Sequence, residues 1–150
     1  MKKLLNTSFA YMIAGLAAGV FYREFTKFTG FAGKTTLGVL HPHLLMLGMG
    51  MFLLLALAAR QAPALLENRS WKRFALLYNL ALPGTAVMLL VRGVTQVLAQ
   101  TQGLALNRGM DAAISGIAGI FHILLAVALF FLFSALKAAF AEQQIPAAKN

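Results

Sequence analysis

The sequence has no cysteine and very few acidic residues. The absence of cysteine excludes a disulfide framework, a thiolate metal site and an iron–sulfur cluster held by cysteine. Charged residues make up only 11% of the chain and hydrophobic residues 60%, whereas an ordinary soluble domain is about one quarter charged. A chain of 150 residues cannot bury that much apolar surface in a soluble core. The surplus therefore predicts a lipid bilayer as the main partner.

Acidic residues are outnumbered by basic ones, but the positions of the basic residues do not indicate nucleic-acid binding. Thirteen Lys and Arg against four Asp and Glu give a formal net charge of +9, which in a soluble protein would favour a nucleic-acid partner. Here the basic residues lie mostly at the ends of apolar runs, where they can contact phospholipid headgroups. We therefore predict no nucleic-acid partner.

Four apolar segments are each long enough to cross a hydrocarbon core as a helix, for which about 20 residues suffice. They are continuous and rich in Leu and Ala, unlike the alternating strands of a membrane barrel. We predict an all-α integral membrane protein, in which residues 1–150 form a single four-helix bundle with short loops between antiparallel neighbours. The predicted helices cover about residues 4–22, 36–59, 74–99 and 111–140.

The distribution of Lys and Arg predicts an orientation in which both termini lie in the cytoplasm, because basic residues are enriched in cytoplasmic loops. Eight basic residues fall on the side of the termini and five on the other side. The first group is Lys2, Lys3, Arg60, Arg69, Lys72, Arg73, Lys137 and Lys149, and the second is Arg23, Lys27, Lys34, Arg92 and Arg108.

All three histidines of the chain, His41, His43 and His122, fall inside predicted membrane segments. Ionisable residues inside a bilayer are costly and tend to mark a pathway, a cofactor or a buried partner. At about 1.5 Å per residue, His43 lies roughly 10 Å below Thr36 and His122 roughly 16 Å below Asp111, so we expect similar depths in the outer half of the membrane. His41 and His43 are two residues apart and point roughly 200° from one another, which predicts two different environments.

Small residues accompany the histidines along two helix faces. Small residues let either a second helix or a flat macrocycle approach the backbone closely. Histidine beside such a stripe is what bis-imidazole haem ligation needs, so the candidate cofactor-binding residues are the three histidines with Gly48 and Gly119. The two stripes are Gly38, His41 and Gly48, and Ser115, Gly119, His122 and Ala126.

Arg92 is the other costly residue, near the outer end of the third predicted helix. One interpretation is that its side chain extends to the outer headgroups. The other is that its guanidinium pairs with a carboxylate, either that of Asp111 or a propionate of a haem, because the planar guanidinium suits carboxylates. We include Arg92 among the candidate cofactor-binding residues.

The sequence resembles two families. The string Thr36-Leu-Gly-Val-Leu-His41-Pro-His43-Leu-Leu-Met-Leu-Gly48 is similar to the His-x-His helix of haem–copper oxidase subunit I, in which each histidine faces one of two haems. Nearly the whole chain resembles an uncharacterised family of small bacterial four-helix membrane proteins. The strings that carry this second resemblance are Phe21-Tyr-Arg-Glu-Phe-Thr-Lys-Phe, Met88-Leu-Leu-Val-Arg-Gly-Val-Thr-Gln and Ser115-Gly-Ile-Ala-Gly-Ile-Phe-His122.

The oxidase subunit contains three four-helix arcs with pseudo-threefold symmetry, so the resemblance implies that this chain corresponds to one arc and forms a homotrimer with haem between protomers. Only His41 and His43 match the oxidase pattern, and the chain lacks the further histidines and the histidine–tyrosine motif of a copper site. The resemblance therefore implies haem b without copper, in a bacterial plasma membrane.

Three function classes follow from the sequence. The first is a haem b protein that either transfers electrons with a redox partner or senses or handles a gas. In this class His43 and either His122 or a histidine of a neighbouring protomer are the axial ligands. The second is a transporter or proton relay lined by histidine, and the third is a structural or assembly subunit. An oxidoreductase-like activity belongs to the first class alone.

Overall fold

The computed structural model describes residues 1–104 and 106–143, and every regular element in these two ranges is helical. The first helix is α1 (Lys2–Phe28). A second continuous helical stretch consists of α2 (Leu37–His43), the π-helix η1 (Leu44–Gly50) and α3 (Met51–Gln61). The 3₁₀-helix η2 (Pro63–Leu66) then leads to the two longest helices, α4 (Arg69–Gln102) and α5 (Arg108–Gln143).

Four helices in this part of the chain are long and apolar enough to span a membrane, which confirms the predicted number of spans. Each span extends beyond its predicted apolar run at one end or both, because polar residues continue the helix. Helix α4, for example, begins at Arg69, before the predicted start at residue 74. There the Asn68 side chain accepts a hydrogen bond from the backbone N–H of Ser70 at 2.7 Å and caps the helix. At its other end, Gly103 has φ 68°, the left-handed conformation that suits a helix C-terminus.

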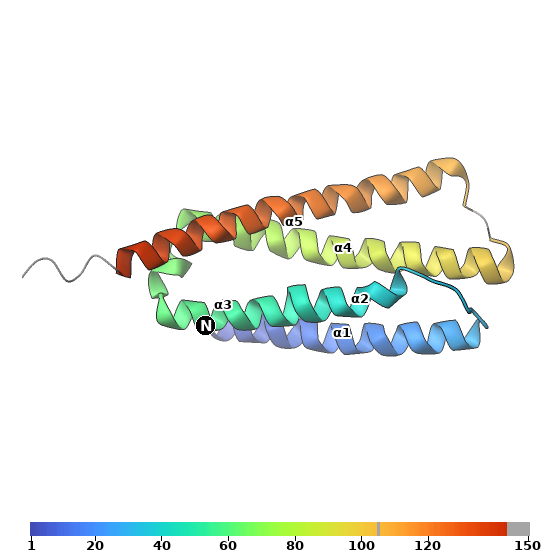
Figure 1. The fold of residues 1–150 in the computed structure, drawn as a ribbon, viewed down its shortest axis with the longest axis horizontal. Coiled ribbons are helices and arrows are strands. Elements are labelled where there is room, and N and C mark those ends of the chain that lie inside the picture. The colour runs from blue at the N-terminus through green and yellow to red at the C-terminus, as the bar shows by residue number, and fades with distance from the viewer. Residues whose placement is uncertain (105, 144–150) are drawn as a thin grey trace, which may run out of the picture.

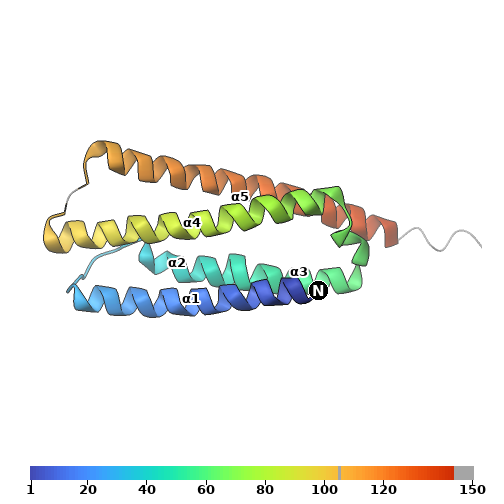
Figure 2. The same cartoon turned by 180° about the vertical axis from the view of Figure 1, so that it is seen from behind.

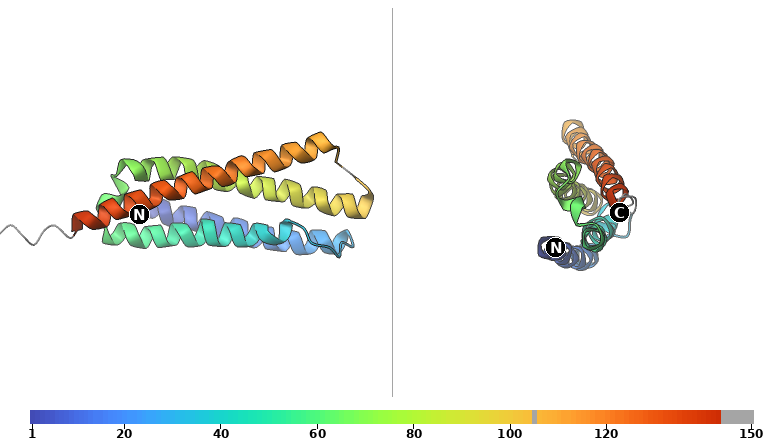
Figure 3. Two further views of the ribbon diagram at one scale, coloured as in Figure 1. Left: turned by 45° about the horizontal axis from the view of Figure 1, so that its top comes forward. Right: turned by 90° about the vertical axis from the view of Figure 1, so that its left-hand side faces the viewer.

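The helices form an open, bent row (Figures 1 and 2). Helix α1 packs against the α2–η1–α3 stretch, α2 packs against α4, and α4 packs against α5, whose first turns diverge from the end of α4 (Figure 1). The end-on view in Figure 3 shows α1 and the start of α5 at opposite ends of the row, while α5 runs obliquely and contacts η2 toward its other end. Each of these two helices therefore has large side chains on the surface, including Phe9, which is 61% exposed, and Phe130, which is 75% exposed.

Helix α1 begins at the same end of the bundle at which α5 ends, as the predicted topology requires (Figure 1). The connection between α3 and α4 lies at this end too, with Arg60 and Arg69 at its borders. The structure thus gathers the larger basic group at one end of the bundle. Lys149, which was counted with this group, lies outside the described residues.

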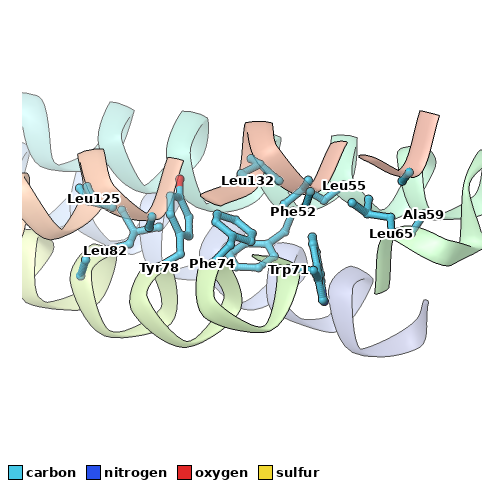
Figure 4. Close-up of a cluster of buried hydrophobic side chains, with 14 of the residues drawn as sticks. Phe52, Leu55, Ala59, Leu65, Trp71, Phe74, Tyr78, Leu82, Leu125 and Leu132 are labelled. Atoms are coloured by element: carbon cyan, nitrogen blue, oxygen red, sulfur yellow. The ribbon is translucent and has the colours of Figure 1, made fainter. Parts of the chain in front are cut away.

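The main buried core lies toward the η2 end of the bundle and is rich in aromatic side chains (Figure 4). Phe74 and Tyr78 of α4 are fully buried, and their ring centroids are 4.9 Å apart. Phe52 of α3 packs edge-on against Tyr78 at 5.9 Å, while Trp71 packs against Phe74 at 5.4 Å. These contacts join α3 and α4, and Leu132 of α5 closes the cluster. The α5 members of this core run from Leu125, at the middle of the helix, to Ala139, so the part of α5 after its midpoint is the more tightly packed.

The π-helix η1 directly follows α2, and Pro42 near the end of α2 has no N–H to donate within the helix. Two hydroxyl groups from neighbouring helices donate to carbonyls of η1. The Tyr78 hydroxyl donates to the Leu47 carbonyl at 2.7 Å, and the Ser8 hydroxyl donates to the Met49 carbonyl at 2.8 Å. Lipid offers no alternative partner to backbone carbonyls. These two hydrogen bonds therefore stabilise the π-helix, which directly follows His41 and His43 in the chain.

Replacing Tyr78 by phenylalanine is expected to lower the free energy of unfolding by about 1 kcal/mol, since interhelical hydrogen bonds in membrane proteins contribute this order of energy. The aromatic ring and its packing remain in the variant. The decrease in the free energy of unfolding therefore measures the contribution of the hydrogen bond to the Leu47 carbonyl alone. Thermal unfolding of the detergent-purified variant measures it. Tyr22→Phe is the matched control, because the Tyr22 hydroxyl makes no hydrogen bond within residues 1–104 and 106–143, and an equal loss in both variants would contradict the assignment.

Candidate functional site

His41 and His43 lie in different environments, as their spacing predicts. The ring of His41 lies over Gly19 of α1, where a Cβ atom on the glycine would be 3.7 Å from the imidazole Cγ. Its Nδ1 atom is buried and has no hydrogen-bond partner among the described residues. His41 is therefore part of the contact between α1 and α2.

His43 and His122 share a different geometry. The Nδ1 atom of His43 is 2.7 Å from the carbonyl oxygen of Val39, and the Nδ1 atom of His122 is 2.8 Å from that of Ala118. A carbonyl oxygen only accepts, so Nδ1 carries the proton in both rings and donates it. In the neutral imidazole the Nε2 atom then holds the free lone pair. This is the tautomer in which a histidine binds a metal through Nε2 while a backbone carbonyl orients its ring.

Both histidines are accessible from outside the single chain. His43 is partly exposed and lies on the face of the α2–η1 stretch that also carries the exposed side chains of Val39 in α2 and Met46 in η1. His122 is exposed, on the stripe of α5 that contains Gly119 and Ser115. The free Nε2 atoms can therefore meet a ligand or a second protein chain without repacking the core.

Two neighbouring residues of α4, Arg92 and Gly93, contact α5 and α2 and so mark the same depth in the membrane on all three helices. The guanidinium of Arg92 reaches the Ser115 hydroxyl of α5 at 2.7 Å. The next residue, Gly93, lies directly against Leu37 of α2, where a Cβ atom on the glycine would be 2.6 Å from the Leu37 backbone nitrogen. We call this depth the Arg92 level.

His43 and His122 lie at nearly equal depths below the Arg92 level. His43 follows Leu37 by six residues, or roughly 9 Å of helix, and His122 follows Ser115 by seven, or roughly 10 Å. The two helices run in the same direction away from the Arg92 level, because both are antiparallel to α4. The structure thus places the two imidazoles within about one helical turn of each other in depth.

The two candidate glycines occupy different kinds of position. Gly48 is buried, and the ring of Tyr11 occupies the space that a side chain at this position would need. Gly48 therefore serves packing between η1 and α1, and a cofactor could approach its backbone only by displacing Tyr11. Gly119, in contrast, is exposed, and a Cβ atom added there would have no described atom within 4 Å.

Arg92 pairs with a carboxylate, which is one of the two interpretations that its sequence allowed. Its guanidinium lies 3.2 Å from Asp111 and donates to the Ser115 hydroxyl, which in turn donates to the Asp111 carbonyl at 2.9 Å. The side chains of Arg92 and Asp111 are 33% and 56% exposed. The contact fixes the first turns of α5 against α4.

Lysine at position 92 is expected to lower the free energy of unfolding by about 0.5 kcal/mol, because a partly exposed ion pair contributes little and lysine lacks the planar fork that bonds both partners. The change is measured by thermal unfolding. Arg23→Lys is the control, since Arg23 pairs with its exposed neighbour Glu24 on the same helix. A loss of several kcal/mol for Arg92→Lys alone would show that Arg92 does more than pair with α5.

A polar pocket of about 320 Å³ lies beside Arg92, and sequence reasoning missed it. No local sequence pattern indicates the pocket, because its lining residues come from three segments: the end of α4, the following connection and the start of α5. We call it the Arg108 pocket. It is lined by Arg92, Thr95, Gln96, Ala99, Leu106, Arg108 and Asp111.

A second, apolar groove of about 480 Å³ lies between α1 and α4 over one face of α2. Its walls consist mainly of small and aliphatic side chains, including Ala14, Leu44 and Ala86. None of the three histidines lines it, so the groove and the histidine positions are separate features.

The described residues contain no group of three or more His, Cys, Asp and Glu side chains that could hold a metal ion. A bare ion such as zinc needs three or four protein ligands, whereas a haem supplies its own equatorial nitrogens and needs only one or two axial side chains. Single histidines with free Nε2 atoms on two helices can therefore serve as axial ligands of a haem. They also suit hydrogen bonding between helices.

The fold defines a multi-pass membrane protein with four spanning helices in the part of the chain that the structure describes. Residues 1–139 match the model of the family described as "Protein of unknown function (DUF2871)", and the chain belongs to that family. No curated protein and no solved structure matches it.

Proposed function

We propose that the protein binds haem b within the membrane and transfers electrons, with His43 and His122 as axial ligands. The observation that carries the proposal is the shared geometry of these two side chains. Each donates its Nδ1 proton to a carbonyl of its own helix, and each leaves Nε2 free at a similar depth. Two histidines would fill both axial positions of the iron, which favours electron transfer with a redox partner over binding of a gas.

The proposed site is shared between copies of the chain. Within one chain α2 and α5 both pack on α4, and neither histidine is covered by the other helix. A haem bound to one of these exposed faces would leave much of its apolar macrocycle uncovered, so a neighbouring protomer is needed to enclose it. The open row of helices, with unpaired faces on α1 and α5, favours a closed ring of copies, and we propose a homotrimer.

Arg92 belongs to the proposed site as a positioning residue. It lies roughly 9 Å above the two histidines, toward the end of the bundle at which α5 begins. A macrocycle held by His43 and His122 with its propionate edge toward that end would bring carboxylates near the guanidinium. The bond from Arg92 to Ser115 already orients the guanidinium along the stripe that carries His122.

The test is an absorption spectrum of the detergent-purified protein from haem-replete cells, recorded in the oxidised and dithionite-reduced states. We expect the sharp reduced bands of a b-type cytochrome and no change when carbon monoxide is added, because both axial positions are filled. A shift with carbon monoxide would contradict the electron-transfer role and indicate gas binding. A colourless protein would refute haem binding and favour a structural subunit or a proton relay.

A further inference from the structure

The Arg108 pocket shares Arg92 with the proposed haem site, but its other residues give it a chemistry that does not depend on haem. Its lining residues include two guanidinium groups and one carboxylate. Asp111 pairs with Arg92, whereas the guanidinium of Arg108 has no ion-pair or hydrogen-bond partner in residues 1–104 and 106–143. The pocket therefore has a net charge of about +1, from one arginine that is not neutralised.

A second donor lies in the same pocket with its orientation fixed. The side-chain oxygen of Gln96 accepts a hydrogen bond from the backbone N–H of Thr36 at 2.9 Å. Because the oxygen is committed to Thr36, the amide NH₂ group of Gln96 remains available as a donor, and no described residue accepts from it. Arg108 and Gln96 together present donors to the pocket, which suits a single anionic group.

The depth of the pocket in the membrane indicates which kind of anion it binds. Helix α4 has 34 residues and is therefore about 51 Å long, whereas the hydrocarbon core is about 30 Å thick. The last turns of α4 and the first turn of α5 consequently extend into the headgroup region. Ala99 and Leu106 give the pocket an apolar wall beside its charged groups, so a ligand with both a charged and an apolar part fits there.

We propose that the Arg108 pocket binds the phosphodiester of an anionic phospholipid. A phosphodiester has one negative charge, which matches the net charge of the pocket. Its oxygens accept from the Arg108 guanidinium and the Gln96 amide, and its glycerol backbone lies along Leu106. An uncharged headgroup such as glycerol suits the pocket better than ethanolamine, because the ammonium group would lie close to Arg108.

Native mass spectrometry of the full chain with added phosphatidylglycerol or phosphatidylethanolamine tests the proposal. We expect one tightly retained phosphatidylglycerol per chain, bound more strongly than phosphatidylethanolamine. Arg108→Gln is expected to weaken this binding about tenfold, because a charge-assisted hydrogen bond contributes energy of that order. Arg69→Gln, at the opposite end of the bundle, is the matched control and is expected to change nothing.

Gln96→Glu provides a second test that preserves the shape of the side chain. A glutamate oxygen can still accept from the Thr36 N–H, but the other oxygen replaces the donor with a negative charge, so the lipid is expected to be lost. Retention of phosphatidylglycerol in both variants would overturn the proposal. Displacement of the lipid by millimolar inorganic phosphate would overturn the lipid as the source of the anion. Loss of haem with unchanged lipid binding in Arg108→Gln would overturn it too, since the pocket would then serve a propionate.

Discussion

Alanine in place of either His43 or His122 is expected to abolish the reduced b-type band of the purified protein. Removing a group that only supports a metal ligand already lowers affinity about 10- to 100-fold, so loss of an axial ligand itself should exceed that range. Haem content per chain, measured from the absorption of the extracted haem, gives the readout. Equal haem content in wild type and both variants would refute the ligand assignment.

His41→Ala is the matched control for these variants. His41 lies on the same helix as His43, but its ring packs over Gly19 and its Nδ1 atom is buried in that contact. The variant is therefore expected to retain haem. Loss of haem in His41→Ala with retention in His43→Ala would transfer the ligand role from His43 to His41.

Mixed oligomers decide whether the two ligands come from one chain or from two. Neither single variant can build a site alone, but in a mixed oligomer an interface can receive His43 from one chain and His122 from its neighbour. Co-expression of differently tagged His43→Ala and His122→Ala chains, followed by purification through both tags, is thus expected to restore part of the haem band. If the haem band is not restored, both ligands come from the same chain, which would contradict a site between two protomers.

Valine in place of Gly93 is expected to have the largest effect on folding, with a loss of about 3 kcal/mol in the free energy of unfolding. A Cβ atom there would lie 2.6 Å from the Leu37 backbone nitrogen, which no change of rotamer can relieve. The same junction contains a hydrogen bond from the Thr35 hydroxyl to the Gly93 carbonyl at 2.9 Å and one from the Thr36 hydroxyl to the Leu89 carbonyl at 3.0 Å. The valine would therefore separate α2 from α4.

Thermal unfolding followed by the fluorescence of Trp71, the only tryptophan, measures this loss, and we expect the midpoint to fall by about 10 °C. Gly116→Val is the control, because a Cβ atom at Gly116 would have no described atom within 4 Å. Both variants replace a glycine of a membrane helix by valine. The effect of helix propensity on stability is therefore the same in the two and cancels when they are compared. A similar midpoint for the two variants would show that the α2–α4 junction tolerates separation.

Part of the candidate site follows from sequence alone, because helical periodicity is a local property. Residues two apart must point to different sides, and the structure confirms this for His41 and His43. The similar depth of His43 and His122 also follows from counting residues along two helices that start at the same side. The hydroxyl bonds to η1 could not be predicted, since Tyr78 and Leu47 lie far apart in the chain.

The role of each small residue required the tertiary structure. Gly48 and Gly119 are the same residue type on apolar helices, yet one is covered by Tyr11 and the other is open. Which neighbour lies beside a glycine depends on the order of the helices in the row, and composition does not encode that order. The Arg108 pocket escaped prediction for the same reason, because Gln96 and Arg108 come from two helices that meet only after folding.

The sequence by itself determined the number of membrane helices, because an apolar run long enough to cross the bilayer must satisfy its own backbone hydrogen bonds there. It also identified His41, His43, His122 and Arg92 as costly ionisable residues within these helices. Only the tertiary structure decided that the helices form an open row, that Arg92 pairs with Asp111, and that His43 and His122 stay accessible on the surface of the single chain. These features depend on which side chains meet across helices, and such contacts exist only once the chain is packed.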